Sequence, residues 1–227
     1  MVFRLSLIVL LFLFSRANGQ EVYIDHVIKA VNDLDSTVQQ YKDEGFIVKP
    51  GRLHKNGLLN AHIKFSNHSS LELMSLAGEP KDRLARTYKD ILLRGGGGAF
   101  ICLSGINIDQ LKVRLEKKDY NFYYIQGKAW SYITFPENSL LHTFFFIDYH
   151  YEVKDEPELY QHSNGCIGFE RVLVEGNDSV FQLMTDIGLF PVKNKSNEFK
   201  TSTGSIVILK NGVTPNKVVD IVMKVRN

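Results

Sequence analysis

Three segments of the chain have the apolar pattern of a strand, and a helix-like stretch follows each of them. The first, residues 24–31, is rich in β-branched side chains, which is typical of a strand. The others are residues 98–103 and 166–174. The helices that follow are expected to start at the capping residues Asp35, Asp109 and Asp178. The first and the third are expected to stop at the left-handed glycines Gly45 and Gly188. Such a repeat indicates a unit that buries its apolar face only by stacking on its neighbours.

Further strand-like runs follow each helix, so the repeat predicts βαβββ modules of an α+β protein. In the first module they are residues 46–49, 61–65 and 71–74, with a turn at Pro50-Gly51; in the second, 123–125, 130–135 and 141–149; in the third, only 204–210 and 217–225. We therefore expect a first module at 20–76, a partly helical linker at 77–98 that ends in four glycines, a second module at 99–150 and a partial third module at 151–227.

The first nineteen residues have the features of a secretory signal peptide. Arg4 gives a positive start, residues 5–14 are apolar, and Ala17-Asn18-Gly19 provides the small residues of a cleavage site. An uncleaved membrane anchor is the alternative, but ten apolar residues are short against the roughly 20 that span a bilayer. The sequence thus predicts a secreted or otherwise extracytoplasmic protein that starts at Gln20 and has no membrane segment after cleavage.

Charge and cysteine content limit the function classes. Removal of the signal takes two arginines from the 27 basic residues and leaves 25 basic against 25 acidic residues. Nucleic-acid binding is not expected, because it needs a basic surplus on one face. Cys102 and Cys166 either form a disulfide or serve as small buried side chains.

The first module contains three short motifs: Ile24-Asp25-His26-Val27, the helix end at residues 41–46, and the closing Ser70-Leu71-Glu72-Leu73. Together they resemble the first module of the vicinal oxygen chelate superfamily. Two further segments, residues 50–54 with Asn60-Ala61 and, in the last third of the chain, His162-Ser163-Asn164-Gly165, more narrowly resemble its glyoxalase-like domain proteins. The resemblance implies that residues 20–227 form one glyoxalase-like domain, whose modules build curved mixed sheets around a cleft.

The resemblance also implies a divalent metal, Mn, Fe, Ni or Zn, held by one side chain from the first and one from the last strand of each module. His26 and Glu72 match these positions in module one. Asp109 follows Asp35 by 74 positions, and this offset puts Phe100 in the place of His26; in module three Phe169 takes that place. Asp148 is aligned with Glu72, so His26, Glu72 and Asp148 are the expected metal ligands, with Glu72 and Asp148 as the catalytic acids or bases.

Each candidate also has a purely structural interpretation. His26 lies in an apolar strand and could have both ring nitrogens satisfied by protein groups. Glu72 lies between leucines and needs a partner, which His26, an arginine, a metal or water could supply. The ligand pocket is expected to include His54, Asn60, His142 and His162, although His54 and His162 lie in turn-like segments where a structural role is equally natural.

Two functions follow for the inter-module cleft. The first is binding of a small organic ligand with the metal as a Lewis acid; if the protein is an enzyme, it is then a metal-dependent lyase, isomerase or oxygenase. The second is a metal-free binding or sequestration module, favoured by the phenylalanines at two ligand positions. A homodimer is the expected protein partner, since this architecture can exchange modules between chains.

Overall fold

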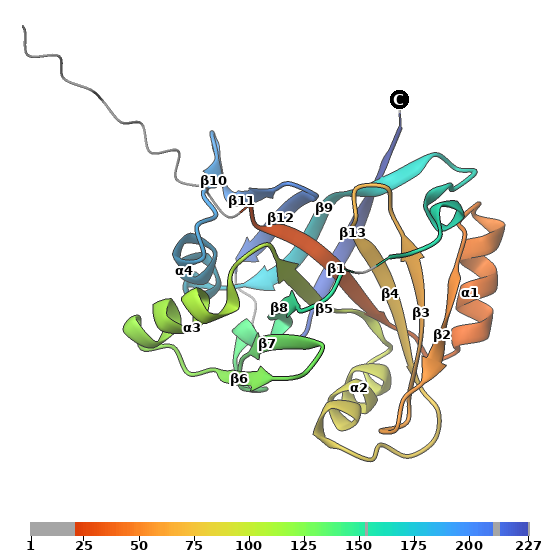
Figure 1. Ribbon diagram of the computed structural model, residues 1–227, viewed down its shortest axis with the longest axis horizontal. Coiled ribbons are helices and arrows are strands. Elements are labelled where there is room, and N and C mark those ends of the chain that lie inside the picture. Colours follow the sequence, from red (N-terminus) through yellow and green to blue (C-terminus); the bar gives the residue numbers. More distant parts are fainter. Residues whose placement is uncertain (1–20, 153, 211–213, 227) are drawn as a thin grey trace, which may run out of the picture.

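The computed structural model describes residues 21–152, 154–210 and 214–226, so the expected signal peptide lies outside the described residues. Thirteen strands form one continuous mixed sheet with the central order β10-β11-β12-β9-β13-β5-β1-β4-β3-β2. Strands β8, β7 and β6 branch from β5. The sheet curves strongly, and Figure 1 shows β1 crossing its centre. The predicted α+β architecture of βαβββ modules in curved mixed sheets is confirmed.

Module one has the predicted order of a strand, a helix and three strands. It consists of β1 (Tyr23–Ala30), α1 (Leu34–Asp43), β2 (Lys49–Leu53), β3 (Leu58–Lys64) and β4 (Ser70–Leu76). Strand β4 runs parallel to β1, whereas β3 is antiparallel to both β4 and β2. The first and last strands are therefore neighbours, and residues of β1 and β4 can share one site.

Module two repeats this topology after the helix α2 (Arg83–Leu93). It consists of β5 (Gly97–Ser104), α3 (Ile108–Lys117), β6 (Tyr123–Gln126), β7 (Trp130–Thr134), the short helix η1 (Leu140–Thr143) and β8 (Phe144–Tyr149). Strand β8 is parallel to β5 and antiparallel to β7. Modules one and two are joined by the antiparallel pair β1 and β5.

The third module follows the short helix η2 (Pro157–Tyr160). It consists of β9 (Cys166–Gly176), α4 (Asp178–Asp186), β10 (Pro191–Val192), β11 (Lys195–Thr201) and β12 (Gly204–Lys210). It therefore has all five elements of the βαβββ order, although β10 is short, and not the partial set that the sequence predicted. An additional strand, β13 (Val218–Val225), lies between β9 and β5. It connects module three to module two.

Helices cover the two faces of the sheet differently. Apolar residues of α1, α3 and α4 belong to one large core cluster that includes residues of all three modules. Helix α2 instead packs on the other face, where Ala85 and Tyr88 join a smaller cluster with Ile28, Met74 and Phe100. Figure 1 shows α1 and α3 at opposite sides of the molecule and α2 below the sheet. We call the face that carries α2 the open face.

Three predicted helix caps are one or two residues too late. The caps are Asp33, Asn107 and Asn177, whose side-chain oxygens accept hydrogen bonds from the amides of Ser36, Gln110 and Ser179 at 2.9, 2.9 and 3.1 Å. The expected Asp35, Asp109 and Asp178 lie in the first turns. There their carboxylates interact favourably with the positive end of the helix dipole. Gly45 and Gly188 do have left-handed backbones, with φ of 87° and 93°.

Two strand predictions also need correction. Pro50 and Gly51 form part of β2 instead of a turn, which is permitted because β2 is an edge strand whose outer side needs no partner. The expected strand at 141–149 starts only at Phe144, because residues 140–143 form the helix η1, capped by the Ser139 hydroxyl. Cys102 and Cys166 are both free and buried, so the structure has no disulfide between them.

None of the helices in the described part of the chain combines the length and the apolar character that a membrane span needs.

Candidate functional site on the open face

A bulge in β1 brings Asp25 and His26 to the same place. The pairing of β1 with β5 shifts register between Ile24 and His26, so Asp25 is an extra residue in the ladder. Side chains of consecutive strand residues normally point to opposite faces, and a bulge changes the direction of one of them. Asp25 Oδ1 consequently lies 2.5 Å from His26 Nδ1. The bulged pair gives His26 a carboxylate partner from the next residue in the chain.

Glu72 faces the other ring nitrogen of His26. Ile28 of β1 lies directly opposite Glu72 of β4, and His26 Nε2 is 3.6 Å from Glu72 Oε2. Burial by itself lowers the pKa of His26. The hydrogen bond and charge of Asp25, with the charge of Glu72, more than offset burial and raise the pKa above its usual 6.5. An imidazolium held between two carboxylates is the favoured state.

Asn60 fixes the second oxygen of Glu72. Its amide nitrogen donates to Glu72 Oε1 at 2.7 Å, and its amide oxygen accepts from the backbone N–H of Arg52 at 2.9 Å. A side chain at Gly51 would collide with Asn60, because a Cβ there would lie 2.1 Å from both the backbone and the side-chain oxygen of Asn60. The glycine in the edge strand therefore allows β2 to come close enough to orient Asn60.

His62 completes the group of polar side chains around Glu72. Its Nε2 lies 3.1 Å from Asn60 Nδ2 and 3.8 Å from Glu72 Oε1. Because Asn60 donates, His62 Nε2 accepts and the proton is on Nδ1, which is buried with no partner among the described residues. Burial lowers the pKa of His62 to about 4, although the charge of Glu72 opposes this. His62 is thus neutral, in contrast to His26.

A polar cavity of about 590 Å³ lies at one end of the open face. Asp25 and Asp148 line it, together with Tyr149, whose hydroxyl donates to Asp25 Oδ1 at 3.4 Å. Lys64 also lines it and pairs with Asp155 at 3.4 Å. The cavity therefore offers hydroxyl groups and carboxylates more than apolar surface.

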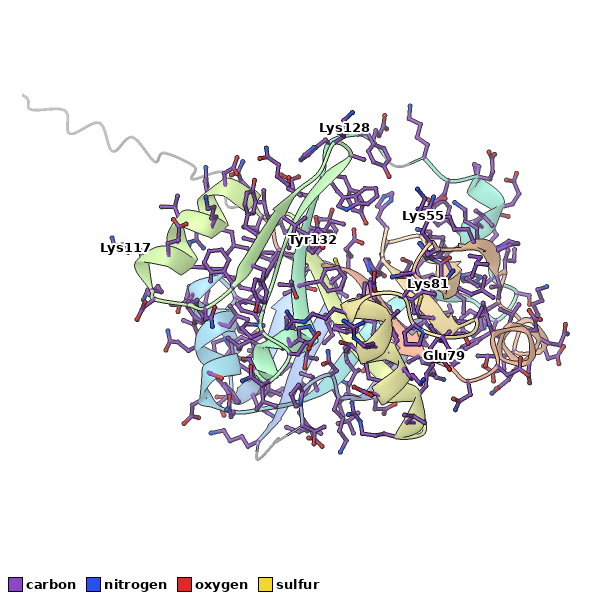
Figure 2. All side chains as sticks on the ribbon, turned by 90° about the horizontal axis from the view of Figure 1, so that it is seen from below. Lys55, Glu79, Lys81, Lys117, Lys128 and Tyr132 are labelled. Carbon is purple, nitrogen blue, oxygen red and sulfur yellow. The ribbon has the colours of Figure 1, made fainter. Side chains whose placement is uncertain are left out.

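An apolar cavity of about 460 Å³ lies at the other end, between α2 and the strands of module two. Its wall is mostly aromatic: Tyr88, Phe100, Tyr123, Trp130, Tyr132 and Phe145. Figure 2 views this side from below, with Tyr132 labelled on β7 near the yellow helix α2. Phe145 also contacts the His26 ring edge-on at 5.4 Å between centroids, so the cavity wall borders the Asp25–His26–Glu72 group.

The donor set does not fit the four-ligand metal site that the superfamily resemblance implies. The helix caps Asp33 and Asn107 are 74 positions apart, and this offset puts Phe100 in the place of His26 and Cys102 in the place of Ile28. Glu72 lies opposite Ile28, and Phe145 lies opposite Cys102. By this register the counterpart of Glu72 is Phe145 and not Asp148. Two of the four positions carry phenylalanine rings, which cannot bind a metal.

A different set of donors does come together. Asp25, His26 and Cys102 each offer one atom, and these atoms all lie within 4.8 Å of one another. The Cys102 side chain is buried, and burial together with the charges of Asp25 and Glu72 raises the pKa of its thiol well above 9 in the metal-free protein. Metal ligation needs the thiolate, so a cation that binds this trio has to displace the thiol proton.

The structure does not bring all the predicted site residues together. His26, Glu72 and Asn60 are together, and His142 lines the apolar cavity. Asp148 lines the polar cavity, apart from the apolar one. His54 and His162 line neither cavity, and His162 instead bridges two chain segments by hydrogen bonds to the backbone of Ile47 and Lys64.

Sequence reasoning missed Asp25 and His62. His62 could have been found, because it follows Asn60 with the period of two that places both on one face of β3. Asp25 could not, since that same period assigns it to the face opposite His26 until the bulge is known.

Comparison with known proteins agrees with this architecture. Residues 24–184 match the family model described as a glyoxalase-like domain. The chain belongs to this glyoxalase-like domain family. The match places it in the vicinal oxygen chelate superfamily, as the motifs of module one indicate. Comparison with curated proteins gives no significant match.

Several solved structures are similar to this glyoxalase-like protein, and the first of them shows the fold. A hypothetical protein from Staphylococcus aureus is 15% identical, with 86% of this chain and 88% of that chain covered and a TM-score of 0.65. A hypothetical protein from Bacillus halodurans is 16% identical, with 59% of this chain and 99% of that chain covered and a TM-score of 0.48. Methylmalonyl-CoA epimerase from Mycobacterium tuberculosis is 20% identical, with 58% of this chain and 90% of that chain covered and a TM-score of 0.47.

Proposed function

We propose that this chain is an extracytoplasmic glyoxalase-like protein that binds a small organic ligand on the open face, without the four-ligand metal of its superfamily. The observation that carries the proposal is the position of the apolar cavity beside the His26–Glu72 pair. Phe145 lines the cavity and contacts His26, and Ile28 lines it and lies opposite Glu72. An apolar cavity with a few convergent polar groups is the usual form of a small-molecule site.

Polar groups beside the cavity wall can transfer a proton. His26 and Glu72 do not line the cavity, but Phe145 and Ile28, which line it, contact His26 and lie opposite Glu72, respectively. The Glu72 carboxylate is a proton acceptor, and the raised pKa of His26, 3.6 Å away, favours the imidazolium that stabilises negative charge. Tyr88 lines the cavity, and burial together with the charge of Glu72 raises the pKa of its phenol well above 10, so it is a neutral hydrogen-bond donor. A carbonyl compound placed there could lose a proton to Glu72 while Tyr88 binds its oxygen.

The binding proposal is tested with naphthalene as a fluorescent probe. Thr134 lines the cavity, so Thr134→Phe fills it, and we expect at least about a tenfold loss of affinity from the excluded apolar contact. Thr185→Phe, on the exposed side of α4, is the matched control and should bind as the wild type does. Equal binding by all three proteins would contradict the proposal.

Catalysis and binding alone are separated by hydrogen exchange. Phenylacetone has acidic protons next to its carbonyl group and an aromatic ring for the cavity. If Glu72 acts as a base, the wild type accelerates deuterium incorporation in D2O, measured by proton NMR, and Glu72→Gln does not. Exchange at the buffer rate with retained binding would assign the binding or sequestration function, which the phenylalanines at positions 100 and 145 favour.

A divalent metal is the second candidate, because Asp25, His26 and Cys102 lie within 4.8 Å of one another. Protein exposed to Mn, Fe, Ni or Zn and then desalted is analysed for bound metal. The metal-free proposal expects none at stoichiometric amounts. One equivalent in the wild type that is lost in Cys102→Ser would overturn it.

The extracytoplasmic part of the proposal is supported by residues 1–19 of the sequence. Expression of the full chain in secreting cells should release a protein whose amino terminus is Gln20, determined by terminal sequencing. Retention of the complete chain inside the cells would contradict it. The expected homodimer is tested on the same material by light scattering at several concentrations.

A further inference from the structure

His142 is a buried polar side chain in the wall of the apolar cavity. It lies in η1, is 7% exposed, and contacts Phe100 edge-on at 5.4 Å between ring centroids. Its Nδ1 is 2.8 Å from the side-chain oxygen of Asn216, which belongs to the segment before β13. The histidine of module two is thus held by a residue that follows module three in the sequence.

The hydrogen bonds of Asn216 determine which ring nitrogen of His142 carries the proton. The amide nitrogen of Asn216 donates to the backbone oxygen of His142 at 3.3 Å, and its backbone N–H donates to the Thr143 hydroxyl at 3.1 Å. The amide oxygen therefore faces His142 Nδ1 as an acceptor, and Nδ1 carries the proton. Nε2 of the neutral ring is left as a hydrogen-bond acceptor.

The lone pair of Nε2 is available to a ligand. Among the described residues no hydrogen-bond partner of His142 Nε2 is found, and it is not one of the ring nitrogens sealed from solvent, which are His54 Nε2 and His62 Nδ1. The nearest charged groups, Arg83 of α2 and Glu137, pair with each other at 2.6 Å. The cavity thus combines a wide aromatic wall with one fixed acceptor.

We infer that the apolar cavity selects a neutral planar molecule that carries a hydroxyl group, with His142 Nε2 accepting the hydroxyl proton and Asn216 positioning the imidazole. This inference rests on the proposed function, because it names the ligand class of the same cavity. A ligand without a hydrogen-bond donor displaces water from Nε2 and leaves this buried nitrogen unpaired, which costs free energy. The selection therefore comes from this penalty as well as from the new hydrogen bond to a hydroxyl group.

The test compares three probes of nearly the same shape: 2-naphthol, 2-methoxynaphthalene and naphthalene. For the wild type at pH 7.5 we expect 2-naphthol to bind about fivefold to tenfold more tightly than 2-methoxynaphthalene, the ratio typical of one neutral hydrogen bond. His142→Phe keeps an aromatic ring but has no acceptor, so it should bind both probes with equal affinity. His150→Phe, at an exposed histidine after β8, is the matched control and should keep the preference.

Asn216→Asp separates positioning from mere packing. A carboxylate in place of the amide oxygen still accepts from Nδ1 but stabilises the imidazolium, whose Nε2 is a donor. The preference for 2-naphthol is measured from pH 5 to pH 8.5. As the pH falls, we expect Asn216→Asp to lose the preference at a higher pH than the wild type does. In the wild type burial lowers the pKa of His142, so the preference should persist below pH 6.5.

The outcomes are distinct. Equal affinity of the wild type for 2-naphthol and 2-methoxynaphthalene would overturn the inference and leave the cavity as a binding site. Failure of all three probes to bind would overturn the proposed function as well. An unchanged pH profile in Asn216→Asp would overturn the positioning role of Asn216.

Discussion

At the scale of single residues, His26 owes its charge to the bulge that precedes it. Burial alone would make this histidine neutral, and the short contact with Asp25 reverses that outcome. A raised pKa means that the protonated form stabilises the fold. This contribution of His26 to the free energy of unfolding is fully present below its pKa in the unfolded chain, about 6.5. It is lost as the pH rises through the pKa of His26 in the folded protein.

Asp25→Asn removes the charge and keeps the size of the side chain. We expect the pKa of His26 to fall below 6.5, because burial then dominates, and Glu72→Gln to lower it by less, because the Nε2–Oε2 distance of 3.6 Å exceeds that of a hydrogen bond. The measurement is a pH titration of the His26 ring by NMR. A larger effect of Glu72→Gln would show that Asp25 is not the main partner.

His162 shows a polar residue whose role is structural. Its Nδ1 accepts from the backbone N–H of Ile47 at 3.0 Å, its Nε2 donates to the backbone oxygen of Lys64 at 2.8 Å, and its ring contacts Phe46 and Phe65. The motif that suggested a pocket residue thus ties the segment before β9 to module one. A sequence cannot distinguish these roles, because both need a histidine beside apolar residues.

His162→Phe would keep the ring contacts and leave two backbone groups without partners. The expected loss in the free energy of unfolding is about 2–6 kcal/mol, since each of the two unpaired buried groups costs about 1–3 kcal/mol. Urea unfolding at pH 7.5 measures it, with His150→Phe, at an exposed histidine after β8, as the control. A loss below about 0.5 kcal/mol would mean that water replaces both hydrogen bonds.

At the scale of elements, the sequence indicates where helices and strands lie better than where each begins. The strand β12 has the predicted bounds, because its apolar residues 206–209 lie between a glycine and a lysine. Three helices begin earlier than expected, because aspartate in a first turn and asparagine or aspartate at the cap satisfy similar preferences. Strand β11 escaped prediction because its sequence, Lys195–Thr201, is mostly polar.

The edge strand β2 makes a testable contribution to the site through Gly51. A methyl group in Gly51→Ala would overlap with Asn60, so β2 must move away from β3, and we expect a loss of about 1–3 kcal/mol in the free energy of unfolding. Arg52→Ala, the exposed neighbour whose backbone N–H still binds Asn60, is the control. Unchanged stability of Gly51→Ala, measured in urea, would contradict the close approach.

At the scale of the whole molecule, the three modules share one core. The large apolar cluster joins Ile24 and Leu71 of module one, Ile101 and Phe144 of module two, and Val172 of module three. The sequence predicted modules that stack on each other and a strand at 217–225, but not that this strand, β13, lies between β9 and β5. Its place depends on Gly98, where a side chain would contact Val218 at 2.5 Å.

A shared core predicts that no module unfolds by itself. Trp130 is the only tryptophan and lies in β7 of module two, so its fluorescence reports that module, whereas far-UV circular dichroism reports all three. We expect one urea transition with the same midpoint for both signals.

Val172→Ala, in β9 of module three, should lower the urea midpoint of the Trp130 signal, because the cavity it leaves costs about 2 kcal/mol of the free energy of unfolding. Val113→Ala, 63% exposed on α3, should leave the midpoint unchanged, although it lies in the same module as Trp130. If Val172→Ala shifted only the circular dichroism, module three would be an independent folding unit, and a contact between Asn216 and His142 could not hold the ligand cavity in a fixed state.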